Sequence, residues 1–227
     1  FLQSLISDGI IESYSVEELR VQNRNWNEEW EKTINVVKVT DRIVIKPTFR
    51  DYEPEPGQIV ILIDPKMSFG TGEHQTTKLM IKMIEKYMRP GYKIIDVGSG
   101  TAVLALTAVK LGASSAIAVD NDEWCYMNGT ENCKLNEADS VLSIRMGEIK
   151  DIEETEFDLV LANINKHILI EIKEGLSSKL SHNGTLILSG LLKEDEADIV
   201  SEFGALNLIT TDKEIMDEWM SITFKKM

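Results

Sequence analysis

The order of apolar and polar residues changes near position 58. Beyond it, short runs that are apolar at every position alternate with longer stretches in which apolar residues recur every three or four positions, as on one face of a helix. Strands are expected at 58–63, 93–97, 115–120, 141–146, 157–162, 185–189, 206–211 and 219–225, and helices at 77–88, 102–111, 123–135, 168–180 and 193–203. This alternation predicts an α/β fold with a mostly parallel sheet covered on both faces and an antiparallel terminal strand.

The first 57 residues follow another pattern. Residues 15–19 have the sequence of a short capped helix, and Trp26 and Trp30 are spaced to share one helix face. Residues 42–46 alternate like a strand, and residues 51–57 contain the prolines of a turn or linker. We interpret this block as the end of a small α+β domain followed by a connecting arm.

Composition narrows the class of protein. Hydrophobic residues make up 43% and charged residues 27%, which is typical of a folded globular chain, and no apolar run is long enough for a membrane helix. The net charge of −14 disfavours DNA or RNA as a partner. Cys125 and Cys133 form no C-x-x-C pair, so free thiols and a cytoplasmic location are expected. The three histidines lack metal-ligand spacing, and no metal is expected.

The strongest chemical signal is the stretch 94–103, in which a predicted strand, a glycine loop and a helix follow one another. Such a loop lets a ligand approach the backbone beside a helix N-terminus. A dinucleotide fingerprint would need glycine where this chain has Val103. Asp96, two residues before Gly98, suits a cationic ligand better than a diphosphate, and S-adenosylmethionine carries a sulfonium and an ammonium. A tight turn without a ligand is the other interpretation.

Asp120 ends the next predicted strand, 22 positions after Gly98. In a Rossmann-like sheet this strand end faces the ribose of a nucleotide, so the carboxylate is expected to accept hydrogen bonds from ribose hydroxyls. Asp122 is the substitute candidate for that contact. Alternatively, Asp120 is only the N-cap of the helix that starts at Glu123.

Residues 69–77 are rich in glycine and small polar residues and lie between a predicted strand and a predicted helix. Thr76 and Thr77 stand where the helix starts and are expected to cap it. Gly70 and Gly72 are not needed for capping, and they indicate close contact with a ligand or with another loop.

Asn163 follows the fourth strand of the predicted sheet. Its carboxamide oxygen could orient an amine substrate at the carboxyl edge, although asparagine at a strand end is also common turn chemistry. His74 is a weaker candidate for a catalytic role, and His167 is interpreted as a surface or helix-start residue.

Taken together, residues 96–100, Asp120 and Asn163 resemble the class I S-adenosylmethionine-dependent methyltransferases. The longer string at 64–77, with residues 25–30 and 189–190, resembles the ribosomal protein L11 methyltransferases over positions 24–227. The resemblance implies a remnant of an N-terminal recognition domain at 1–23, a linker and arm at 24–57, and a catalytic domain at 58–227. Because recognition in that family lies largely in the N-terminal domain, restoring upstream sequence is expected to raise kcat/KM on the protein substrate by at least ~10-fold.

Carried over by position, the resemblance implies cofactor contacts at Thr77, Gly98, Asp120 and Asn163. Phe69, Thr71, Asp96 and Gly100 belong to the same motifs and complete the expected cofactor site. The chain departs from the family at Ala102, where glycine is often found, and at Asn165, Lys166 and His167, where small apolar residues are commoner.

The expected function is therefore methyl transfer from S-adenosylmethionine to lysine and N-terminal amines of a basic ribosomal protein. The enzyme is expected to be a monomer that binds neither DNA nor a membrane. Two alternatives stay open: a methyltransferase of the same fold acting on another protein or a small amine, and a cofactor-binding module without catalysis.

Overall fold

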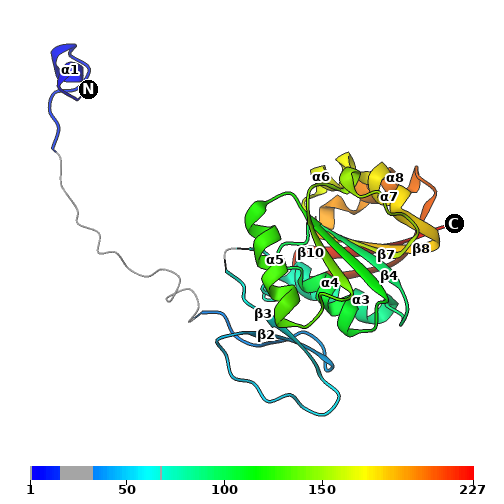
Figure 1. Ribbon diagram of the computed structural model, residues 1–227. Helices are drawn as coiled ribbons and strands as arrows, with labels where there is room; N and C mark the ends of the chain where they lie inside the picture. Colours follow the sequence, from blue (N-terminus) through cyan, green and yellow to red (C-terminus); the bar gives the residue numbers. More distant parts are fainter. Residues whose placement is uncertain (1, 16–32, 67) are drawn as a thin grey trace.

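The computed structural model describes residues 2–15, 33–66 and 68–227 (Figure 1). The helix expected at 15–19 and the Trp26 and Trp30 pair lie outside the described residues. A short helix that the sequence pattern did not indicate, α1 (Leu2–Ser7), has no buried residue. No helix of the described residues is long and apolar enough to cross a membrane.

A seven-stranded sheet forms the centre of the molecule. Its spatial order is β6 (Leu142–Met146), β5 (Ser115–Asp120), β4 (Lys93–Val97), β7 (Phe157–Asn163), β8 (Leu180–Leu192), β10 (Trp219–Lys226) and β9 (Leu208–Met216). The strands from β6 to β8 run parallel, and β10 is antiparallel to both β8 and β9. The predicted α/β fold with an antiparallel end is confirmed, and β10 lies inside the sheet while β9 forms its edge.

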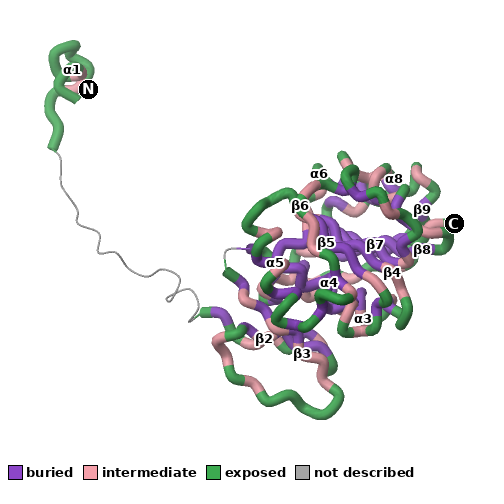
Figure 2. The backbone as a smooth tube through the Cα atoms, viewed as in Figure 1, coloured by how far each residue is buried: buried purple, intermediate pink, exposed green. Residues whose placement is uncertain are grey.

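Helices cover both faces of this sheet (Figure 1). One layer contains α3 (Gln75–Tyr87), α4 (Val103–Lys110) and α5 (Glu123–Leu135), and the other contains α6 (Lys166–Glu171), α7 (Lys173–Lys179) and α8 (Glu196–Gly204). Neighbouring residues of one strand enter different cores: Ile94 packs with the first layer and Ile95 with the second. Figure 2 shows the buried strands between the two layers. This double burial explains why the central strands β4, β5 and β7 are mostly apolar without a two-residue alternation.

Two predicted helices differ from the structure. The single helix expected at 168–180 is divided into α6 and α7 at Ile172, where φ is −100° and ψ is 10°. Apolar periodicity continues through this residue, so the pattern could not reveal the break. The helix expected at 193–203 starts with a 3₁₀ turn, Lys193–Asp195, before α8.

A second sheet of three strands lies beside the first layer of helices (Figure 1). In it β1 (Val37–Lys38) pairs antiparallel with β2 (Ile43–Pro47), and β2 pairs parallel with β3 (Ile59–Ile63). The strand expected at 58–63 is therefore part of this small sheet and not of the central one. The boundary predicted between positions 57 and 58 falls between two hydrogen-bonded strands, and the division of the chain into domains stays a prediction.

Three buried asparagines spaced four residues apart, two on α5 and one at its C-cap, hold the outer side of the β3 segment. Asn136 accepts a hydrogen bond from the Leu62 N–H at 3.0 Å and donates one to the Leu62 carbonyl at 2.7 Å. Asn132 accepts from the Asp64 N–H at 2.8 Å, and Asn128 donates to the Asp64 carbonyl at 2.8 Å. Side chains thus satisfy backbone groups that a further strand would otherwise pair.

We expect Asn132→Ala to lower the free energy of unfolding by about 2–4 kcal/mol, because it leaves one buried and one partly buried backbone group without these partners. These are the Asp64 N–H and the Thr101 carbonyl, to which Asn132 Nδ2 donates at 3.1 Å. Urea denaturation measures the change. Lys134→Ala, on the exposed side of the same helix, is the control and should alter stability by less than about 0.5 kcal/mol. Equal losses in the two variants would contradict the assigned role of Asn132.

Candidate functional site

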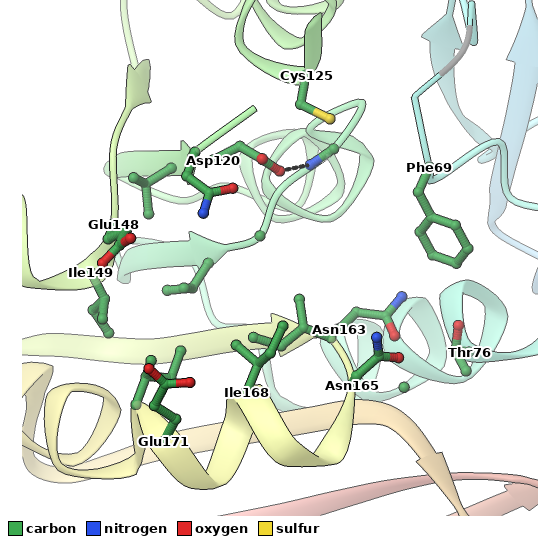
Figure 3. Close-up of a pocket in the computed structure, with 18 of the residues that line it drawn as sticks. Phe69, Thr76, Asp120, Cys125, Glu148, Ile149, Asn163, Asn165, Ile168 and Glu171 are labelled. Carbon is green, nitrogen blue, oxygen red and sulfur yellow. Dashed lines mark hydrogen bonds between the residues drawn. The ribbon is translucent and has the colours of Figure 1, made fainter. Parts of the chain in front are cut away.

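A cavity of about 590 Å³ opens at the carboxyl edge of β4, β5 and β7 (Figure 3). Six of the predicted site residues line it: Phe69, His74, Gly98, Gly100, Asp120 and Asn163. Three others, Thr71, Thr77 and Asp96, do not border it, and their contact with a ligand stays a prediction. Parallel strands bring their carboxyl ends to one edge, which explains how residues far apart in sequence meet here.

The glycine loop between β4 and α4 is held tightly against its neighbours. Gly98 and Gly100 have φ values of +70° and +54°, a region that favours glycine. A Cβ at Gly98 would lie 2.5 Å from the Ile164 side chain, and one at Gly100 would lie 2.3 Å from the Phe69 carbonyl oxygen. The loop can therefore present its backbone to the cavity only because these positions have no side chain.

Asp120 fixes the other side of this loop. Its Oδ2 accepts a hydrogen bond from the Gly100 N–H at 2.9 Å, and its Oδ1 accepts one from the Asp122 N–H at 3.0 Å. The N-cap of α5 is Asp122, whose Oδ1 accepts from the Trp124 N–H at 2.7 Å. The interpretation of Asp120 as a helix cap is therefore wrong. Its carboxylate borders the cavity, where its remaining lone pairs can accept hydrogen bonds from a ligand.

The segment around Phe69 is bound to the glycine loop through Thr101. The Phe69 carbonyl accepts from the Thr101 N–H at 2.9 Å, and the Thr101 hydroxyl donates to the Gly70 carbonyl at 2.9 Å. A Cβ at Gly70 would lie 2.5 Å from that hydroxyl, and one at Gly72 would lie 2.3 Å from the Ile45 side chain. Gly70 thus contacts another loop, which was one of the two expectations, whereas Gly72 lies against the strand β2.

His74 caps α3, and the expectation that Thr76 and Thr77 do so is wrong. The His74 Nδ1 accepts from the Thr76 N–H at 3.3 Å, because the ring reaches the first turn from the N-cap position. Thr76 lines the cavity, whereas Thr77 is fully buried behind it and its hydroxyl has no hydrogen-bond partner.

Three aromatic rings stand together at this end of the cavity. His74 makes edge contacts with Trp219, at 4.9 Å between ring centroids, and with Phe69, at 5.4 Å. Burial lowers the pKa of His74, and the Glu218 carboxylate opposes this shift. A lowered pKa favours the neutral imidazole, which does not repel a cationic ligand.

Asp96 lies under the glycine loop without reaching the cavity. Its Oδ2 accepts from the Ala105 N–H in the first turn of α4 at 3.1 Å, and its Oδ1 is buried without a partner. The Asp96 carboxylate thus caps α4, because Ala102 at the N-cap position has no side-chain acceptor. The pKa of Asp96 is raised to about 7: burial is the main cause, the hydrogen bond from Ala105 opposes it, and the Asp120 carboxylate adds to it.

This raised pKa predicts a pH-dependent stability. Because the folded-state pKa is about 7 and the ordinary value is 3.8, the folded protein holds a proton that the unfolded chain has lost. The stability that this proton contributes is complete below the ordinary pKa and disappears as the pH rises through 7. Between about pH 5 and pH 7, the unfolding free energy should fall by about 2–3 kcal/mol relative to Asp96→Asn. Urea denaturation across this range tests it, and a constant difference would contradict it.

Asn163 ends β7 and contributes an acceptor that lacks a donor. Its Oδ1 is buried and has no hydrogen-bond partner, although the residue borders the cavity. Buried polar atoms are rarely left unpaired in folded proteins. A ligand with an N–H or O–H group is thus the partner that this oxygen can accommodate. Among the described residues, no cluster of His, Cys, Asp and Glu side chains could hold a metal ion.

The family model described as Ribosomal protein L11 methyltransferase (PrmA) matches residues 3–227. The chain belongs to this family. Its members are S-adenosylmethionine-dependent methyltransferases.

Relatives and a solved structure agree with this assignment. Ribosomal protein L11 methyltransferases from Ruminiclostridium cellulolyticum and Listeria monocytogenes are 34% and 36% identical, over 90% and 91% of this chain and 66% of each relative. A ribosomal protein L11 methylase structure from Lactobacillus delbrueckii has a TM-score of 0.77 at 29% identity, covering 85% of this chain and 99% of that one. The chain spans about two thirds of the length of the curated relatives it matches.

The positions expected to depart from the ribosomal protein L11 methyltransferase pattern have different surroundings. Ala102 is fully buried with a φ of 63°, a conformation in which glycine is less strained. Lys166 forms ion pairs with Asp195 and Asp198, and His167 is exposed in the first turn of α6, as expected. Asn165 lines the cavity.

Sequence reasoning missed part of the cavity wall. Gly147, Glu148 and Ile149 follow β6, so the end of the predicted strand at Met146 was an available signal. Trp219 is the first residue of β10. Because β10 runs antiparallel to β8, it begins at the edge of the sheet where the parallel strands end. Only the topology could place this residue at the site.

Proposed function

We propose that this chain transfers methyl groups from S-adenosylmethionine to lysine side-chain and N-terminal amines of ribosomal protein L11. One observation carries the proposal: a carboxylate at the end of β5 and an unpartnered carboxamide oxygen at the end of β7 border the same cavity, in a chain of this family. The first group suits the hydroxyls of a nucleoside, and the second suits an amine.

The residues present fit the proposed methyl donor. Asp120 would accept hydrogen bonds from the ribose, and the Gly98 to Gly100 backbone lets the donor approach without a side chain in the way. When bound, S-adenosylmethionine supplies a methyl group on a sulfonium sulfur, and the bond to nitrogen forms as the bond to sulfur breaks with its electron pair remaining on sulfur. Little charge needs stabilising, so positioning is the main task of the protein.

The amine must arrive without its extra proton, because only a free lone pair can form the new bond. A lysine in water has a pKa of about 10.4, and a site that is poor in water favours its neutral form. Asn163 Oδ1 would accept an N–H bond of this amine and so direct the lone pair into the cavity. We assign His74 the secondary role of shaping that end with a neutral ring. The ammonium product would then release a proton to water.

The charge of the chain supports a basic protein as the acceptor. A net charge of −14 attracts a positively charged partner and speeds encounter, although it does not fix geometry. We propose that the enzyme works as a monomer in the cytoplasm, where Cys125 and Cys133, free in the structure, would stay reduced.

Mass spectrometry of ribosomal protein L11 incubated with the chain and isotope-labelled S-adenosylmethionine tests this function, and label on lysine and N-terminal amines is expected. Calorimetry with S-adenosylmethionine and with NAD runs beside it, and only the first should bind. Methylation of other amines but not of L11 would favour a different acceptor. Binding of S-adenosylmethionine without any transfer would indicate a module without catalysis, and binding of NAD alone would overturn the cofactor assignment.

A further inference from the structure

We propose that Asn165 is a second carboxamide that binds the acceptor nitrogen, and that it limits how many methyl groups that nitrogen receives. The inference rests on the proposed function and concerns a position that is expected to differ from the family pattern. Asn163 alone can orient an amine, whereas two carboxamides can distinguish an unmodified amine from a methylated one.

Asn165 occupies the N-cap position of α6 but does not cap the helix with its side chain. Asparagine is among the strongest N-cap residues, so an idle carboxamide at this position is unusual. Instead the residue lines the cavity together with Asn163. Lys166, the next residue, forms ion pairs with Asp195 at 2.7 Å and Asp198 at 3.1 Å, which hold the start of α6 in place.

Figure 3 shows a division of polar groups within the cavity. The labelled carboxylates, Asp120, Glu148 and Glu171, lie away from Phe69, whereas Asn163 and Asn165 lie toward the Phe69 and Thr76 side. The part of the cavity beside Asp120 and the glycine loop is the proposed site of the methyl donor. The second part therefore offers neutral carboxamide oxygens, which suit a neutral amine rather than an ammonium ion.

The number of N–H groups decides how well this pair of acceptors is satisfied. A neutral primary amine has two N–H donors and one lone pair. Two carboxamide oxygens can accept both donors, which leaves the lone pair as the only free direction. Each methylation replaces one N–H by N–CH₃, and the proton is released to water. The next round therefore leaves one carboxamide oxygen without a donor.

The affinity lost when a carboxamide oxygen has no N–H donor depends on whether water can reach that oxygen. Asn165 is exposed in the free protein, so its oxygen is hydrated there. Asn163 Oδ1 is buried already. A docked acceptor chain would cover Asn165 as well, and a covered acceptor without a donor weakens binding by about 10-fold. Sites built to bind an N–H or O–H group reject analogues that lack it for this reason.

The test compares the wild type with Asn165→Leu and, as a second variant of smaller volume, Asn165→Ala. His167→Ala is the matched control, because His167 is exposed in the same helical turn and does not border the cavity. Peptide mass spectrometry of L11 over time gives rate constants for the first and second methyl groups at each site. We expect the first to exceed the second by about 10-fold in the wild type and in the control, and by less than about 3-fold in both Asn165 variants.

A binding measurement without turnover accompanies the kinetics. In the presence of S-adenosylhomocysteine, the wild type and the control should bind unmodified L11 about 100-fold more tightly than L11 whose amines have been reductively dimethylated, because the dimethylated amine leaves both carboxamide oxygens without a donor. The Asn165 variants should keep only about a 10-fold preference, because Asn163 alone then loses its donor. Comparing ratios between variants removes any effect of the modification on distant contacts.

The possible failures can be told apart. If the wild type transfers no label to L11, the proposed function is wrong and this inference falls with it. If the wild type methylates L11 and the Asn165 variants keep its rate ratio and its binding preference, the role of Asn165 alone is overturned. The same holds if His167→Ala changes both ratios as much as the Asn165 variants do.

Discussion

Gly100→Ala is expected to weaken S-adenosylmethionine binding by at least about 100-fold, or ~2.7 kcal/mol. At a φ of +54°, the new Cβ would lie 2.3 Å from the Phe69 carbonyl oxygen. That oxygen cannot retreat easily, because it accepts the Thr101 N–H at 2.9 Å. Alanine also costs about 1–2 kcal/mol in a left-handed conformation. Both effects displace the loop that faces the cavity, and calorimetry measures the lost affinity.

Gly129→Ala provides the control for this substitution. Gly129 lies in α5, and a Cβ there would meet its nearest atoms at 3.5 Å, an ordinary contact that includes the Gly100 carbonyl. Binding should stay at the wild-type level, and stability should rise by up to about 1 kcal/mol because alanine favours a helix. A similar loss of affinity in the two variants would show that the Gly100 backbone conformation is not what the ligand requires.

Asp120→Ala is expected to weaken cofactor affinity by about 1.5–3 kcal/mol, the range for hydrogen bonds to a charged acceptor. The variant loses the proposed ribose contacts and also the acceptor of the Gly100 N–H. The helix α5 should survive, because Asp122 caps it. Calorimetry gives the affinity, and far-ultraviolet circular dichroism follows the helix.

Asp122→Ala separates the two acidic residues. It removes the cap of α5 and should cost about 1 kcal/mol of stability while cofactor affinity stays near that of the wild type. Should Asp122→Ala weaken binding as much as Asp120→Ala does, the ribose contact would have to be reassigned.

Much of the central domain could be predicted because its signals are local. The bounds of β4, β5 and α5 agree with the predicted ranges. β4 and β5 are buried on both faces and are mostly apolar without alternation, and the helix was expected to start at Glu123. The break between α6 and α7 at Ile172 had no such signal, because the spacing of the buried apolar residues continues from one helix into the next. The order of β9 and β10 was also hidden, since antiparallel pairing does not tell which strand is at the edge.

Part of the candidate site could also be predicted from local sequence signals. Gly98, Asp120 and Asn163 stand at the ends of parallel strands, so predicting the strands brings them to one edge. Contacts between distant segments were beyond a single sequence. Asn136 bonds a backbone group 74 positions away, and its spacing from Asn132 is equally typical of an exposed helix face. Trp219 reaches the cavity only because β10 enters the sheet antiparallel.

The position of β10 between β8 and β9 has a consequence for biosynthesis. A ribosome makes β9 before β10, yet in the sheet β9 pairs only with β10. At elongation rates of about 5–20 residues per second, β8 and β9 therefore wait with open edges until β10 has left the exit tunnel. Nascent chains stalled before Trp219 should be cleaved readily by a protease, whereas chains extended far enough to release Lys226 should resist it. Completion of this domain is thus expected to follow, and not to accompany, translation of its last strands.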